Sequence, residues 1–158
     1  GLDYHFLRFS QIVIPGSEIL EWFSHQSMGP EVNKKLHYSD FCNDVMGIAF
    51  CAVVCSDAGC TVFSSDAAHK YIQWNFIANG KEIHFEEAEV DISTVTSDHI
   101  LLSYISTTDL GGKFSKSLVE YDANGFCQIG IRFETYCWDK GAPLRSSKGV
   151  KKCGVRLL

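Results

Sequence analysis

Hydrophobic residues recur at every second position over much of the chain, which is the pattern of half-buried β-strands. The alternation is clear over residues 128–134 and 152–157. From Gly47 to Cys55, by contrast, odd-numbered and even-numbered positions are both apolar. A strand of that kind has protein on both of its faces, so we expect it at the centre of a sheet.

Helical periodicity is almost absent. One short helical turn is predicted over Ser17–Ser24, where Ser17 could cap it and Ile19, Trp22 and Phe23 could face inward. Short strands separated by turn signals are typical of sandwiches and barrels. The pattern therefore predicts an all-β fold, an antiparallel β-sandwich of jelly-roll or immunoglobulin-like type with little helix.

The most specific local signal is the pair Asn79-Gly80, since a type I′ turn requires positive φ at both of its central residues. A two-residue loop fixes the register of a hairpin over Tyr71–Glu86. That register places apolar side chains opposite each other at every second pair, so turn chemistry and hydrophobic pattern agree. The expected pairs are Ala78 with Lys81, Phe76 with Ile83 and Trp74 with Phe85.

Further turn signals divide the chain without any linker, repeat or low-complexity stretch between them, which predicts a single domain over residues 1–158. The first residue is Gly1 rather than Met, so we expect a fragment of a larger protein. The turn signals are Ser56–Gly59, Ser64–Asp66, Asp109–Gly112 and Asp122–Gly125. Longer loops are expected at about 56–70, 87–96, 106–116 and 138–147.

Charge and cysteine content narrow the class of partner and the compartment. A net charge of −5 argues against a nucleic-acid partner, and a late basic run is best explained as a solvated face. Seven cysteines cannot all pair within the chain, and no signal peptide or membrane-length apolar run is present. We expect reduced, buried thiols, no membrane association, and a cytoplasmic protein with a nuclear pool as a further location.

Candidate chemistry is sparse. Cys51, Cys55 and Cys60 lack zinc-ligand spacing, and no nucleophile elbow or phosphate loop occurs. Carboxylates crowd at 86–91, which is more typical of a solvated strand edge than of an acid/base pair. We therefore expect no catalytic residue, metal or cofactor, although a triad assembled only in three dimensions stays open.

Three segments resemble a known family. They are Ile14-Pro-Gly-Ser-Glu-Ile-Leu-Glu-Trp-Phe-Ser-His-Gln-Ser27, then Gly47–Val53 followed by Ser97–Tyr104, and finally Val150–Leu157. In this order they resemble the domain that follows the leucine-rich repeats (LRRs) in plant TIR-type intracellular immune receptors, the C-terminal jelly-roll/immunoglobulin-like domain. Leu20 stands where that family more often has a second proline.

The resemblance implies a sandwich that packs on the receptor's own repeats and helps to recognise a pathogen effector protein directly. The NAD-cleaving TIR domain of such a receptor lies outside this chain. Aromatic residues on loops of a rigid scaffold are common anchors of protein recognition. The motif residues are interpreted as structural; they are Pro15, Gly16, Ser17, Glu18, Trp22 and Phe23, beside the turn residues Asn79 and Gly80.

Effector specificity is expected on loops without family motifs, namely Ser56–Lys70, Thr107–Lys116 and Trp138–Lys148. Three alternatives stay open: an enzyme, a carbohydrate-binding sandwich, and a purely structural cap of the repeats. The partner-binding candidates within the three loops are His69, Lys70, Lys113, Phe114, Trp138, Lys140 and Arg145.

Overall fold

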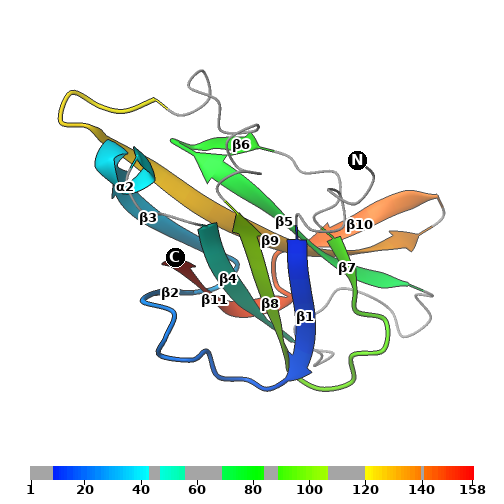
Figure 1. Ribbon diagram of the computed structural model, residues 1–158. Coiled ribbons are helices and arrows are strands. Elements are labelled where there is room, and N and C mark those ends of the chain that lie inside the picture. The colour runs from blue at the N-terminus through cyan, green and yellow to red at the C-terminus, as the bar shows by residue number, and fades with distance from the viewer. Residues whose placement is uncertain (1–8, 43–46, 56–68, 84–88, 107–119, 140) are drawn as a thin grey trace, which may run out of the picture.

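A computed structural model describes residues 9–42, 47–55, 69–83, 89–106, 120–139 and 141–158 (Figure 1). These residues form two antiparallel sheets that pack face to face, which confirms the predicted all-β sandwich. Sheet A contains, in spatial order, β1 (Phe9–Pro15), β8 (His99–Ser106), β4 (Gly47–Val54), β11 (Val150–Leu157) and β2 (His25–Met28). Sheet B contains β10 (Ala142–Ser146), β9 (Phe126–Asp139), β5 (Lys70–Ala78) and β6 (Lys81–Ile83), with β3 (Glu31–His37) beside β9 and β7 (Glu89–Asp91) beside β5.

The core lies between the sheets and is built around aromatic rings. Phe50 of β4 meets Trp74 of β5 edge-on, with ring centroids 4.7 Å apart, and Phe76 lies next to both. All three side chains are fully buried. Because every residue of β4 is buried, the prediction of a central strand with protein on both faces is confirmed.

The predicted hairpin register is confirmed as far as the described residues reach. Ala78 pairs with Lys81 and Phe76 with Ile83 across the turn. Asn79 and Gly80 have φ values of 49° and 85°, as the turn chemistry requires. Phe85 lies outside the described residues, so its predicted pairing with Trp74 stays a prediction.

The helical turn expected at Ser17–Ser24 was wrong. An isolated hydrogen-bonded turn forms in place of a helical one, closed by the Phe23 amide donating to the Leu20 carbonyl at 3.1 Å. Phe23 is buried and Ile19 packs beside it as predicted, but Trp22 is 44% exposed instead of facing inward. Contacts with sheet A, described below, hold residues 17–24 in this non-helical path. The one helix among the described residues is α2 (Tyr38–Cys42), where the Asp40 carboxylate accepts from the His37 amide at 2.9 Å.

Two predicted loops contain strands. Where a loop was expected over 138–147, β9 continues to Asp139 and the chain returns as β10 over Ala142–Ser146, with Gly141 at φ 83° between them. The 87–96 segment includes the edge strand β7. The turn at Asp122–Gly125 is confirmed: the Asp122 carboxylate accepts from the amides of Asn124 and Phe126. The other three turn signals fall outside the described residues.

Candidate protein-interaction surfaces

Residues 16–24 run across the outer face of sheet A and cover its β4 and β11 side. The Arg156 guanidinium donates to the Trp22 carbonyl at 2.7 Å and lies 4.7 Å from the centre of the Trp22 ring. Lys152 pairs with Glu18 at 2.9 Å. The first and last family-like motifs are therefore one structural unit, joined across 134 residues of chain.

Two glycines let this segment come close to the sheet. A Cβ on Gly154 would lie 3.2 Å from the Phe23 Cβ and 3.3 Å from the Cys51 sulfur. Gly16 has φ 151°, and a Cβ there would meet Ile100 at 3.0 Å. Phe23 can thus seat in a second apolar cluster on the outer face, with Ala49, Cys51, Val53 and Ile100.

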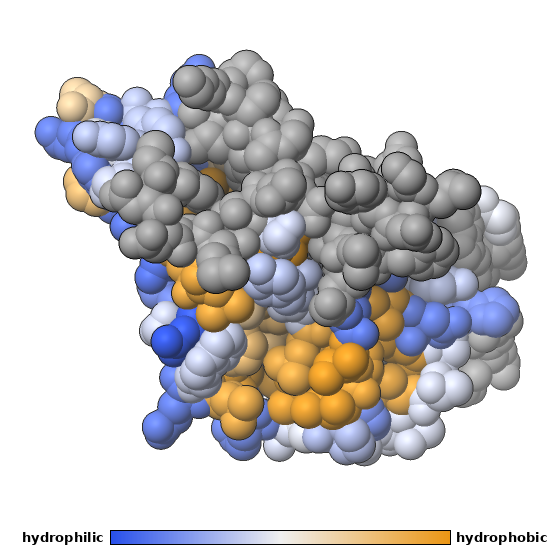
Figure 2. Space-filling view, viewed as in Figure 1, coloured by the Kyte–Doolittle hydropathy of each residue, from blue (hydrophilic) through white to orange (hydrophobic). Residues whose placement is uncertain are grey.

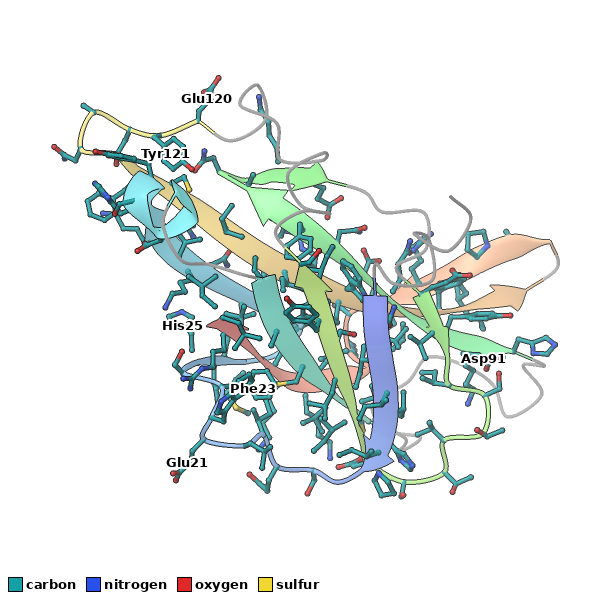
Figure 3. All side chains as sticks on the ribbon, in the orientation of Figure 1. Glu21, Phe23, His25, Asp91, Glu120 and Tyr121 are labelled. Carbon is teal, nitrogen blue, oxygen red and sulfur yellow. The ribbon has the colours of Figure 1, made fainter. Side chains whose placement is uncertain are left out.

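The β1 and β8 side of the same face stays open. An apolar groove of about 310 Å³ lies there, and Figure 2 shows hydrophobic side chains gathered over these strands. Ile12 and Leu20 at the groove are 57% and 64% exposed. In Figure 3, Glu21 points away from the sheets whereas Phe23 lies against them. The groove is lined by Ile12, Leu20, Trp22, Phe23, Ala49, Leu102, Ser103 and Tyr104.

The outer face of sheet B has a different character. Strand register places Arg145 opposite Tyr136, Tyr136 opposite Tyr71, and Tyr71 opposite Asp91, across β10, β9, β5 and β7. The two tyrosine rings stack at 5.2 Å, and the guanidinium lies 5.0 Å from the Tyr136 ring centre. The His69 ring lies beyond Tyr71, tilted against it with centroids 6.4 Å apart. We call the four aligned residues the Arg145–Asp91 row.

Hydrogen bonds hold the row rigid. Arg145 donates to the Gln73 side chain at 2.7 Å, and the Tyr136 hydroxyl donates to Glu89. Burial, helped by the contact with Glu89, raises the pKa of Tyr136 to about 12. Ser93 donates to Asp91 and lowers the pKa of that carboxyl, so the row keeps a cation at one end and an anion at the other.

A third surface lies at the end of the sandwich beside α2. An open hollow of about 450 Å³ is lined by Tyr121, Phe126 and polar side chains that include Lys35. Figure 3 labels Tyr121 and Glu120 at this end. The Asn79 amide joins the hairpin turn to the hollow's wall, since it donates to the Glu120 carbonyl at 2.7 Å and accepts from the Gln128 amide at 2.9 Å.

The structure brings together some of the predicted partner-binding residues. His69 and Arg145, from two different predicted loops, lie at opposite ends of the same pair of stacked tyrosines. Lys70 is not in a loop but begins β5, where its amide donates to Ser93 at 3.0 Å. Trp138 lies in β9 opposite Pro143, and its side chain is outside what the structure describes. Lys113, Phe114 and Lys140 also lie outside the described residues.

Sequence reasoning missed other residues that build these surfaces, Tyr136 and Ile12 among them. Tyr136 gave no signal, because its role depends on the register of four strands. The open groove could have been noticed, since Ile12, Val13 and Ile14 are consecutive apolar residues in what proves to be an edge strand. A strand with consecutive apolar residues has apolar side chains on both faces of its sheet, which predicts that the outer face is covered as well as the inner one.

Thiols and charged groups of the described residues suggest no reactive centre. The thiols at 51, 127 and 153 are free and buried, those at 55 and 137 are buried as well, and burial raises the pKa of Cys51 and Cys153 to about 12. No cluster of three or more potential metal ligands occurs in the described part of the chain. Nor does any helix in that part have the length and apolar character to cross a membrane.

The two packed antiparallel sheets define a β-sandwich domain. The family model of the C-JID domain matches residues 14–158, so the chain belongs to this family, the non-catalytic domain that follows the leucine-rich repeats of TIR-NB-LRR immune receptors. No match to the chain was found among curated proteins.

Proposed function

We propose that this domain binds a pathogen effector protein directly while it packs on the leucine-rich repeats of its own receptor. The observation that carries the proposal is the Arg145–Asp91 row. Tyrosine and arginine are enriched at the centres of protein interfaces, where they anchor binding. In this row Arg145 and Asp91 are exposed and Tyr71 is half-buried, so they can contact a partner, while the buried Tyr136 supports them from below. Opposite charges at the two ends would fix the orientation of the partner.

Two of the three predicted loops support the same placement: Ser56–Lys70 ends beside Tyr71, and Trp138–Lys148 contains Arg145. In this proposal the row is a fixed platform, and these segments carry the residues that set effector specificity. The proposal assigns the domain no catalytic step, no cofactor, no membrane contact and no nucleic-acid partner, and places the receptor in the cytoplasm with a nuclear pool.

The test begins with a pull-down of purified candidate effectors by the full-length receptor and by the isolated domain. For an effector that binds, R145A and D91A in the receptor should each weaken binding at least tenfold. E21A, which removes an exposed charge on the opposite side, is the matched control. Unchanged binding by both row variants would contradict the placement.

A loop exchange separates recognition from a purely structural cap. Ser56–Lys70, Thr107–Lys116 and Trp138–Lys148 are replaced together by those of a relative with another specificity. Effector-triggered cell death and direct binding should both follow the loops, with protein abundance and thermal unfolding as folding controls. A cap without a recognition role would leave specificity with the original scaffold.

Carbohydrate binding is a second candidate, and the hollow beside α2 favours it. Its volume lies within the range of small-molecule sites, and sugars commonly stack on aromatic rings such as Tyr121. The Asn79 amide, however, is already engaged within the chain. A glycan array with the wild-type protein and Y121A would detect this function as signals that the variant loses.

A further inference from the structure

Sheet A exposes more contiguous apolar surface than scattered single residues would. Ile12, Ile14, Leu20 and Trp22 are between 40% and 64% exposed, and Ile12, Leu20 and Trp22 border the same groove. Contiguous apolar surface of this kind on a soluble protein usually marks an interaction site.

The groove is preformed. Trp22 is held by the Arg156 guanidinium, and Gln26 donates to the carbonyls of Leu20 and Phe23, both at 3.1 Å. The floor comes from the central strands, through Ala49 and Leu102. Because its walls are fixed by the family-like motifs at both ends of the chain, a partner would not have to order this surface.

We propose that this groove docks the last leucine-rich repeats of the same receptor chain. The inference rests on the proposed function, in which the domain packs on its own repeats, and it names the surface. In this family the repeats precede the domain, so their chain enters through Phe9, the start of β1. β1 is the edge strand that borders the groove, and Ile12 lies only about 10 Å along it from Phe9.

The chemistry of the groove on sheet A and of the row on sheet B indicates which partner each face binds, the repeats or the effector. A partner in the same chain is always present and keeps an apolar groove covered, as in permanent interfaces. An effector is present only during infection, so an apolar site for it would stand exposed at other times and favour aggregation. The polar and aromatic Arg145–Asp91 row suits the transient partner, and the groove suits the permanent one.

Site-specific cross-linking tests this docking in the full-length receptor without effector. The photo-reactive residue p-benzoylphenylalanine replaces Ile12 in one protein and Leu20 in another. In a control protein it replaces Lys148, an exposed residue beyond β10. After irradiation, mass spectrometry identifies the peptides joined to each position. Cross-links from positions 12 and 20 should reach the last repeats of the same chain, independent of protein concentration, whereas position 148 should give none to the repeats.

A second variant tests the contact itself. I12D places a charge in the groove, and because Ile12 is more than half exposed the domain should still fold. It should reduce cross-linking from position 20 to the repeats at least tenfold. The proposal is overturned if positions 12 and 20 cross-link only to a second copy, or to nothing, or if they cross-link only to effector in a parallel sample to which effector is added. An effector pull-down with the same proteins separates failure of this inference from failure of the proposed function. If the effector still binds but no cross-links to the repeats form, only the docking surface is rejected.

Discussion

The guanidinium of Arg156 lies 4.7 Å from the ring centre of Trp22 and donates to the carbonyl of the same residue at 2.7 Å. This single side chain fixes both the backbone and the ring of the segment that walls the apolar groove. Because the two residues come from the first and last family-like motifs, their contact joins these motifs into one structural unit.

Removal of this contact should loosen the segment. R156A loses a cation–π contact and a charged hydrogen bond, which together should cost about 1–2 kcal/mol in the free energy of unfolding. E18A breaks a more exposed ion pair, with the Glu18 side chain 85% exposed, and should cost less than about 0.5 kcal/mol. Urea denaturation of both variants checks the order, and equal losses would contradict it.

Gly154 should tolerate no side chain while Phe23 is in place. G154A brings its Cβ to 3.2 Å from the Phe23 Cβ, which has little freedom to move, so we expect a loss of about 1–3 kcal/mol. An F23A background keeps at position 23 the Cβ that a side chain at Gly154 would meet, and the 3.3 Å contacts with the Cys51 sulfur and the His25 carbonyl persist. Without the ring seated in the apolar cluster, however, the backbone at position 23 is free to move away from β11, so the 3.2 Å contact can relax. A double-mutant cycle should therefore show a smaller cost of G154A in that background, and additive losses would refute the explanation.

Asn79 should matter for more than its turn. N79G keeps a residue that accepts positive φ but removes both side-chain hydrogen bonds, to the Glu120 carbonyl and from the Gln128 amide. We expect a loss of about 1–2 kcal/mol in thermal or urea unfolding. A neutral or stabilising effect would mean that the residue serves the turn alone.

The raised pKa of Tyr136 predicts that the folded protein loses stability at alkaline pH. Its pKa rises from 10.0 to about 12 in the folded state, so between these values the unfolded chain binds fewer protons than the folded one. The stabilisation is complete below pH 10 and is lost as pH approaches 12, by at most about 2–3 kcal/mol. Denaturation curves of Y136F across this range should show a smaller decline than wild type. Y38F, which removes an exposed hydroxyl, is the control, and parallel curves for all three proteins would exclude the effect.

Local chemistry determined much of the fold in advance. The Asn79-Gly80 turn set the hairpin register because only certain residues accept positive φ, and the period-two alternation of β9 and β11 assigned their inner faces. The continuous apolar run of β4 identified a central strand. The family resemblance rested on motifs that can be read along the chain and is confirmed by the match over residues 14–158.

The surfaces depended on contacts that no local pattern contains. Residues 17–24 avoid a helix because Arg156 and Lys152, more than a hundred residues away in the chain, hold them against sheet A. The Arg145–Asp91 row exists only because three strand pairings align four residues, and a shift of one position in any of them would turn a side chain to the other face. Sequence pattern thus determined which residues face the core, and long-range pairing alone decided which outward residues meet.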